Sequence, residues 1–172
     1  MKTSYFNGIN TGKLDFDYNV RYRPRTDVSI LGMENQIKYL FRDINYEYIS
    51  FVWENDRYTK HKHSHSLIKT DDTDFIQKLQ KNILSSKEPI IESNPILIRK
   101  YRTLTSTTSG EKTQKPQDTW ENVESTRIIG RNGDVYIEPV LNVVSSSIYN
   151  HKYTDHGVNF GYIKPTLIYQ TP

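Results

Sequence analysis

Three of the five histidines in the chain stand at alternate positions of one short segment, "HKHSHSLIKT", residues 61–70. On a β-strand, residues two apart project from the same face and lie about 6.5–7 Å from each other. His63 and His65 would therefore share a face, with His61 as a candidate third member. Neutral imidazole nitrogens at this spacing can bind one divalent ion. The pattern predicts a metal site on a strand, and the alternative is a polar surface strand with solvated histidines.

A carboxylate ligand is available in the segment that precedes the histidines. "YEYISFVWE", residues 46–54, is rich in aromatic and β-branched residues and predicts a buried strand that ends at Glu54. "NDRYTK" predicts a turn, so residues 46–70 would form an antiparallel hairpin with Glu54 near the histidines. Two histidines and one carboxylate leave coordination positions open for substrate oxygens. This set suits Mn²⁺ or Mg²⁺ in phosphate chemistry.

A second candidate site lies near the end of the chain, in "SIYNHKYTDHG", residues 147–157. Tyr149, Lys152, Tyr153 and His156 follow the i, i+3, i+4, i+7 spacing of one helix face. A tyrosine oxygen can attack a phosphodiester and hold the DNA end as a phosphotyrosine. Its ordinary pKa is about 10, so it needs activation, and a lysine one turn away can offset charge on the phosphate. The alternative is an amphipathic helix whose tyrosines pack in the core.

The elements that would position these residues can be read from periodicity and turn signals. Strict alternation predicts a half-buried strand that ends at Pro24. Helical spacing predicts two helices, and an apolar run after a proline predicts a further strand. The segment 103–124 is polar and non-periodic, which is typical of a mobile loop. The expected elements are a strand at 13–24, helices at 29–44 and 73–84, strands at 95–102 and 135–140, a helix at 141–153 and a last strand within 157–172.

This order predicts an α+β fold in which an antiparallel sheet carries its helices mainly on one face. The other face of the sheet would then be open to carry a site. At 172 residues the chain is expected to form a single domain, 1–172, with a flexible loop at about 103–125.

Composition narrows the classes of function. The net charge of +3 is mildly basic, which permits nucleic-acid binding without requiring it. The chain has no cysteine, so disulfides and thiolate metal sites are excluded. No apolar run approaches the roughly 20 residues that span a bilayer, and the first residues lack the apolar core of a signal peptide. We therefore expect a cytoplasmic protein without a membrane partner.

Taken together, the motifs and their order resemble the HUH endonuclease superfamily, and within it the rolling-circle replication initiators, or Rep proteins. "NVRYRP" resembles the first strand of many Rep proteins. "FVWENDRYTKHKHSHSLIKT" resembles their Glu-bearing strand, turn and His-x-His strand. "VYIEPVLNVVSSSIYNHKY" resembles their late strand and tyrosine helix. The family carries a hydrophobic residue between the two histidines, where this chain has Ser64.

The resemblance implies a DNA-nicking and DNA-joining enzyme with an HUH-type sandwich fold. It implies Glu54, His63 and His65 as ligands of Mn²⁺ or Mg²⁺, Tyr149 as the nucleophile and Lys152 as its companion. The implied substrate is single-stranded or hairpin DNA at an origin of rolling-circle replication, and a host or viral helicase is an implied partner. The implied setting is a bacterial cell, with the gene carried by a phage or plasmid.

Further residues are candidates for DNA contact. Arg21, Arg23 and Arg25 can hold DNA phosphates, and Tyr153 stands beside the expected nucleophile. Solvated charges near the end of a strand are the alternative for the three arginines.

Two other functions fit the same sequence. A non-enzymatic viral structural or adaptor protein could retain the fold and use exposed aromatic residues as a contact surface, and such a subunit would be expected to self-associate. A small single-strand transposase of the same superfamily would share the chemistry but act as an obligate dimer that joins strands.

Overall fold

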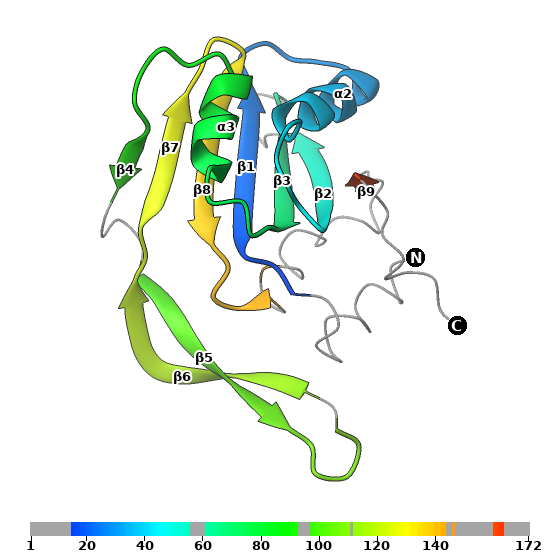
Figure 1. Ribbon diagram of the computed structural model, residues 1–172. Helices are drawn as coiled ribbons and strands as arrows, with labels where there is room; N and C mark the ends of the chain where they lie inside the picture. Colours follow the sequence, from blue (N-terminus) through cyan, green and yellow to red (C-terminus); the bar gives the residue numbers. More distant parts are fainter. Residues whose placement is uncertain are drawn as a thin grey trace.

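The computed structural model describes residues 15–55, 61–92, 97–110, 112–143, 146 and 160–163. Its centre is a seven-stranded sheet in the order β4-β7-β8-β1-β3-β2-β9, and every neighbouring pair in it is antiparallel. A separate two-stranded sheet, β5-β6, extends from the end of this sheet (Figure 1). The elements are β1 (Tyr18–Pro24), α2 (Ile30–Leu40), β2 (Tyr48–Asn55), β3 (Lys62–Lys69), α3 (Phe75–Asn82), β4 (Ile90–Glu92), β5 (Leu97–Thr105), β6 (Lys112–Asn122), β7 (Ser125–Ile129), β8 (Gly133–Pro139) and β9 (Phe160–Ile163).

Both helices cover the same face of the large sheet (Figure 1). The core lies between the helices and this face of the sheet. It includes Met33 and Ile37 from α2, Leu79 from α3, and Phe51 and Ile68 from the sheet, all at most 1% exposed. Alternation along β1, β2, β3, β7 and β8 sends every second side chain toward this core and leaves its neighbours on the opposite face. The predicted α+β fold, with helices on one face of an antiparallel sheet, is confirmed.

The central hairpin also agrees with the sequence prediction. β2 and β3 pair antiparallel along their whole length, from Tyr48 opposite Lys69 to Asn55 opposite Lys62. β1 pairs with β3 on the far side of the hairpin and with β8 beyond it. The strand that carries the histidines is therefore interior to the sheet, with a hydrogen-bonded neighbour on each side.

The two helices begin and end close to their expected positions. Ser29 caps α2, because its hydroxyl accepts a hydrogen bond from the Gly32 amide at 3.1 Å. The helix ends at Leu40, earlier than expected, and Asp43 then adopts a left-handed backbone with φ 63°. α3 follows Asp74, whose side chain makes no capping bond.

The prediction of a flexible loop at about 103–125 is wrong. β5 continues to Thr105 and β6 occupies 112–122, so a turn of a few residues separates two paired strands. The absence of alternating polarity suggested a loop. A strand needs only backbone pairing, however, and a hairpin that extends from the sheet need not alternate in polarity. The segment's many threonines are β-branched and suit a strand.

Two further strands of the large sheet were not predicted from the sequence, but the last one was. The short edge strand β4 and the strand β7 were not expected, and β7 adds Ile128 to the core. The last predicted strand is confirmed by β9, which pairs with β2. Of the helix expected at 141–153, Val143 and Ser146 are helical, and the remainder from 147 on lies outside the described residues.

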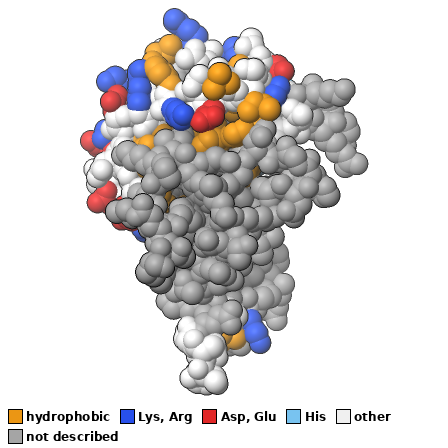
Figure 2. All heavy atoms as spheres, turned by 90° about the vertical axis from the view of Figure 1, so that its right-hand side faces the viewer, with side chains coloured by type: hydrophobic (Ala, Val, Ile, Leu, Met, Phe, Trp, Pro, Cys, Tyr) orange, Lys and Arg blue, Asp and Glu red, His pale blue; other side chains and the backbone are white. Residues whose placement is uncertain are grey.

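The described surface is of mixed character. Figure 2 shows cationic, anionic and hydrophobic side chains interspersed on the described part of one face. Exposed large hydrophobic residues such as Leu31 and Ile91 lie on separate elements, α2 and β4. In the portion of the chain that is described, no helix has the length and hydrophobicity needed to cross a membrane.

One buried side chain joins the two helices. Asn82, 2% exposed, donates from Nδ2 to the carbonyl oxygens of Leu40 and Arg42, each at 2.8 Å, and its Oδ1 accepts from Arg42 Nε at 3.1 Å. Leu40 is the last residue of α2, so its carbonyl has no partner inside the helix. Asn82 therefore completes the C-terminus of α2 from α3.

We expect Asn82→Ala to lower the free energy of unfolding by about 2 kcal/mol, because it leaves two backbone carbonyls without their donor. Urea denaturation followed by circular dichroism measures this change. Gln77→Ala, at an exposed position of the same helix, is the control and should change stability by less than about 0.5 kcal/mol. Equal effects of the two substitutions would contradict the assigned role.

Candidate metal centre

Strand pairing brings the three predicted ligands together. Glu54 of β2 lies directly opposite His63 of β3, and Val52 lies opposite His65. Glu54, His63 and His65 therefore project from the same face of the sheet. His63 and His65 are two residues apart on β3, and Glu54 stands beside them on β2. This is the face opposite the helices, because the intervening Trp53 belongs to the helix-side core.

The side chains converge on one point. His63 Nε2 lies 3.1 Å from Glu54 Oε1, and His65 Nε2 lies 3.2 Å from the same oxygen. One ligand atom from each of the three residues falls within 4.8 Å of the others. The prediction that alternate histidines and the preceding glutamate form one cluster is therefore confirmed as a possible metal-binding triad.

The triad is sheltered, which argues against the alternative of solvated histidines. The side chains of His65, Glu54 and His63 are 5%, 13% and 23% exposed. Burial lowers the pKa of His65 below its ordinary value, and the hydrogen bond to Glu54 partly opposes this shift. His65 is thereby held as the neutral imidazole, which is the form that binds a metal.

The distances fit one cation. Ligand atoms about 2.1 Å from a shared ion lie about 3–3.5 Å from one another. The two histidine-to-glutamate distances already fall in this range, and the ligand atoms of the two imidazoles lie within 4.8 Å of each other. The same geometry also serves as a pair of hydrogen bonds to one carboxylate, so the triad is stable without an ion and ready to bind one.

The triad opens into a small pocket on the same face, the metal-side pocket. It has a volume of about 240 Å³ and is lined by Arg21, Tyr22, Arg23, Glu54, His63, His65 and Tyr136. Arg21 stands directly opposite both His65 and Tyr136 in the sheet. A ligand in this pocket would meet the triad on one side and two arginines with an aromatic ring on the other.

Arg21 is held in place by its neighbours on β8. Its Nη2 donates to Glu138 Oε1 at 2.9 Å, and its guanidinium lies 5.3 Å from the centre of the Tyr136 ring. Arg127 of β7 lies 5.2 Å from the same ring. Tyr136 therefore sits between two cations, next to the triad. The sequence contained a signal for it, because alternation in "VYIEP" separates Tyr136 and Glu138 from the buried Val135 and Ile137.

The other predicted site residues divide into two groups. Arg25 and His61 lie in a neighbouring pocket with Asp134, and Arg23 lines both pockets. His61 Nε2 is 2.8 Å from the carbonyl oxygen of Pro24, so His61 is not part of the triad. Tyr149, Lys152 and Tyr153, predicted as nucleophile, companion and DNA contact, lie outside the described residues, as does His156.

Ser64, the residue between the two triad histidines, points into the core. It is 0% exposed and stands opposite Tyr22 on one side and Trp53 on the other. A small side chain between two large aromatic ones satisfies the packing of this layer. Among the described residues the Ser64 hydroxyl has no hydrogen-bond partner. Ser64 is thus a core-packing residue on the face away from the triad.

Comparison of the chain with protein-family models, with curated proteins and with solved structures gave no match.

We expect calorimetric titration with Mn²⁺ to show one site on the wild-type protein. His63→Ala and His65→Ala should each weaken binding by at least about tenfold, because each removes a ligand, and the double variant should not bind. His61→Ala is the matched control from the same strand and should bind as the wild type does. Equal affinities in all three single variants, with folding verified by circular dichroism, would rule out the triad.

Ser64→Ala should raise the free energy of unfolding by about 1 kcal/mol. The substitution removes a buried hydroxyl without a partner and leaves the neighbouring aromatic rings their space. Chemical denaturation measures the change, and Mn²⁺ affinity should stay the same, since the side chain faces away from the triad. A loss of stability would show that the hydroxyl has a structural partner.

Proposed function

We propose that the protein nicks and rejoins single-stranded DNA by transesterification through a tyrosine, in the manner of HUH-type rolling-circle initiators. The observation that carries the proposal is the triad of Glu54, His63 and His65, which lies on the sheet face opposite α2 and α3 and adjoins a pocket lined by Arg21 and Arg23. A divalent cation can stabilise the charge that develops in phosphodiester chemistry and cationic side chains can position the phosphates, and this pocket offers residues for both roles.

Each described residue has a defined part in the proposed reaction. Glu54, His63 and His65 would hold the divalent ion, which supplies stabilisation of the negative charge that develops on the phosphoryl oxygens. Arg21 and Arg23 would bind backbone phosphates, and Tyr136 offers a ring on which a base can stack. In the proposed reaction none of these residues is assigned the attack on the phosphate, and the nucleophile is taken from elsewhere in the chain.

The nucleophile proposed from the sequence is Tyr149. Its phenolic oxygen would form a bond to phosphorus while the bond to the 3′-oxygen breaks, and the 3′-oxygen would leave with a proton as a free hydroxyl. The DNA 5′ end would remain on the protein as a phosphotyrosine, and attack by a 3′-hydroxyl would reverse the step. Lys152 would offset charge on the phosphate.

The ligand set favours Mn²⁺ over Mg²⁺ as the ion. Mg²⁺ prefers oxygen ligands and gives up its hydration water reluctantly. Two of the three triad ligands are imidazole nitrogens, which bind first-row transition ions more readily. We therefore propose Mn²⁺ as the more effective cofactor in vitro.

One observation favours a second candidate function, that of a viral structural or adaptor protein. The β5-β6 hairpin extends well beyond the large sheet (Figure 1). An arm of this kind can dock on a neighbouring subunit by strand pairing along its edges. This alternative predicts self-association and no covalent complex with DNA.

The test is incubation of the full chain with random-sequence single-stranded DNA and Mn²⁺, followed by mass spectrometry. The wild-type protein should form a covalent protein–DNA adduct, and Tyr149→Phe should form none, since it lacks the attacking oxygen. Tyr39→Phe, at an exposed tyrosine of α2, is the matched control and should react like the wild type.

An adduct that persists in Tyr149→Phe would show that the nucleophile is a different residue. Absence of any adduct from the wild type, together with a concentration-dependent oligomer in analytical ultracentrifugation, would favour the structural or adaptor protein instead.

A further inference from the structure

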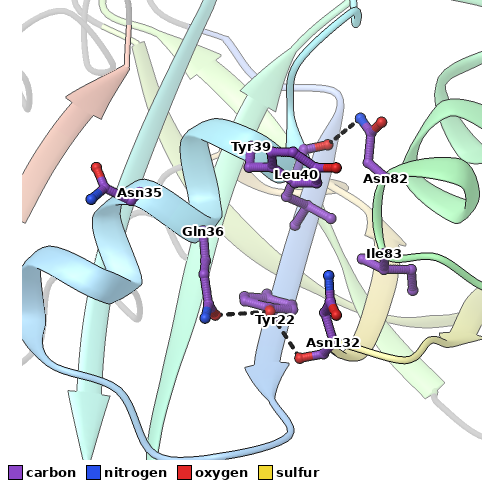
Figure 3. Close-up of a pocket in the computed structure, with 8 residues that line it drawn as sticks. All are labelled: Tyr22, Asn35, Gln36, Tyr39, Leu40, Asn82, Ile83 and Asn132. Carbon is purple, nitrogen blue, oxygen red and sulfur yellow. Dashed lines mark hydrogen bonds between the residues drawn. The ribbon is translucent and has the colours of Figure 1, made fainter.

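A second cavity lies on the helix side of the sheet, away from the triad. It has a volume of about 330 Å³ and lies between α2, the end of α3, β1 and the turn that joins β7 to β8. We call it the amide pocket, after the side chains that line it: Tyr22, Asn35, Gln36, Tyr39, Leu40, Asn82, Ile83 and Asn132 (Figure 3). Four of these eight residues carry a carboxamide, and none carries a charge.

The pocket combines an apolar interior with aromatic walls. Leu40 and Ile83 are each 2% exposed and contribute apolar surface. In Figure 3 the rings of Tyr22 and Tyr39 border the space from opposite sides. Tyr39 is 41% exposed, and the guanidinium of Arg42 lies 3.6 Å from the centre of its ring. A flat ligand could lie against these rings, and a charged group would have no partner inside the pocket.

The Tyr22 hydroxyl lies between two acceptors at the base of the pocket. The Tyr22 hydroxyl is 2.9 Å from Gln36 Oε1 and 3.2 Å from the carbonyl oxygen of Asn132. Burial raises the pKa of Tyr22 to about 12, so the phenol keeps its single hydrogen at neutral pH. The Asn132 carbonyl also accepts from the Arg25 backbone amide at 3.0 Å. One hydrogen is thus shared between two acceptors, and a ligand N–H could serve Gln36.

Asn132 offers the complementary pair of groups. Asn132 is exposed, and in Figure 3 its side-chain amide projects toward the space between Tyr22 and Ile83. A carboxamide presents one donor and one acceptor side by side. This is the arrangement that pairs with the N6 and N7 atoms of adenine.

We propose that the amide pocket binds the adenine base of a nucleoside or nucleotide. The ring would stack on the exposed ring of Tyr39, its N7 edge would pair with Asn132, and an exocyclic N–H would donate to Gln36. The ribose and any phosphate would remain outside, since the lining is uncharged. The volume of about 330 Å³ exceeds that of a purine base and lies at the lower end of the roughly 300–1,000 Å³ range of small-molecule sites.

This site is independent of the proposed nicking reaction. Asn132 and Tyr39 are not among the residues that line the metal-side pocket, and the amide pocket lies on the other face of the sheet. Tyr22 lines both cavities, so its substitution would disturb both sites and is unsuitable as a test.

The test is calorimetric titration of the full chain with adenosine, with uridine and ribose as comparison ligands. Adenosine should bind, and uridine and ribose should bind at least about tenfold more weakly because they lack the N6–N7 edge. Tyr39→Ala should weaken adenosine binding by about tenfold or more through loss of stacking, and Asn132→Ala by about tenfold through loss of the paired hydrogen bonds.

Two control variants separate the outcomes. Lys38→Ala, on α2 outside the pocket, should bind adenosine as the wild type does. His63→Ala should bind Mn²⁺ more weakly and retain adenosine binding, so failure of the proposed nicking activity leaves this result unaffected. The proposal is overturned if the wild type does not bind adenosine at millimolar concentration, if ribose binds as well as adenosine, or if both pocket variants bind like the wild type.

Discussion

The register of the β2-β3 pair is the constraint on which the candidate metal centre depends. Glu54 stands opposite His63, so a shift of one residue in either strand would send its ligands to the helix side of the sheet. The core prevents such a shift. Phe51 and Trp53, which alternate with Glu54 on β2, stack with ring centres 5.2 Å apart and are 1% and 7% exposed. Burial of each ring stabilises this register by roughly 2–3 kcal/mol.

The triad must also be stable as a polar group in a sheltered place. A carboxylate and two imidazoles with low exposure would destabilise the fold if they stood alone. Here one oxygen of Glu54 serves both histidines, so the three groups compensate one another. An arrangement that satisfies itself in this way is preorganised, because its ligands need little movement to receive a cation. The hydrophobic core on one face thus fixes the register of the triad residues. Hydrogen bonds among these residues on the other face offset the cost of burying their polar groups.

The parts of this structure that follow from the sequence are those with a strong alternation or a strong apolar period. The alternate histidines, the aromatic strand before them and the apolar positions of α3 each indicate their element directly. The strand expected at 95–102 corresponds to most of β5, but the end of β5 and the whole of β6 could not be found in this way, since their pairing depends on backbone hydrogen bonds and their residues do not alternate in polarity. Tyr136 was predictable as an outward-facing strand residue, but its position beside the triad depends on the pairing of β8 with β1. Pairing between distant strands leaves no local signal in the sequence.

β1 connects the two candidate sites, because successive residues of a strand face opposite sides of the sheet. Arg21 projects toward the triad and Tyr22 toward the amide pocket. Arg21 is 42% exposed and paired with Glu138, and an ion pair of this exposure contributes at most about 1 kcal/mol. An incoming phosphate can therefore replace Glu138 at little cost. Tyr22 is buried, and its hydroxyl lies within hydrogen-bond distance of two acceptors. These contacts hold Tyr22 in place when the Arg21 side chain moves. β1 can therefore bind an anion through Arg21 on one face while Tyr22 on the other face keeps the strand in its position in the sheet.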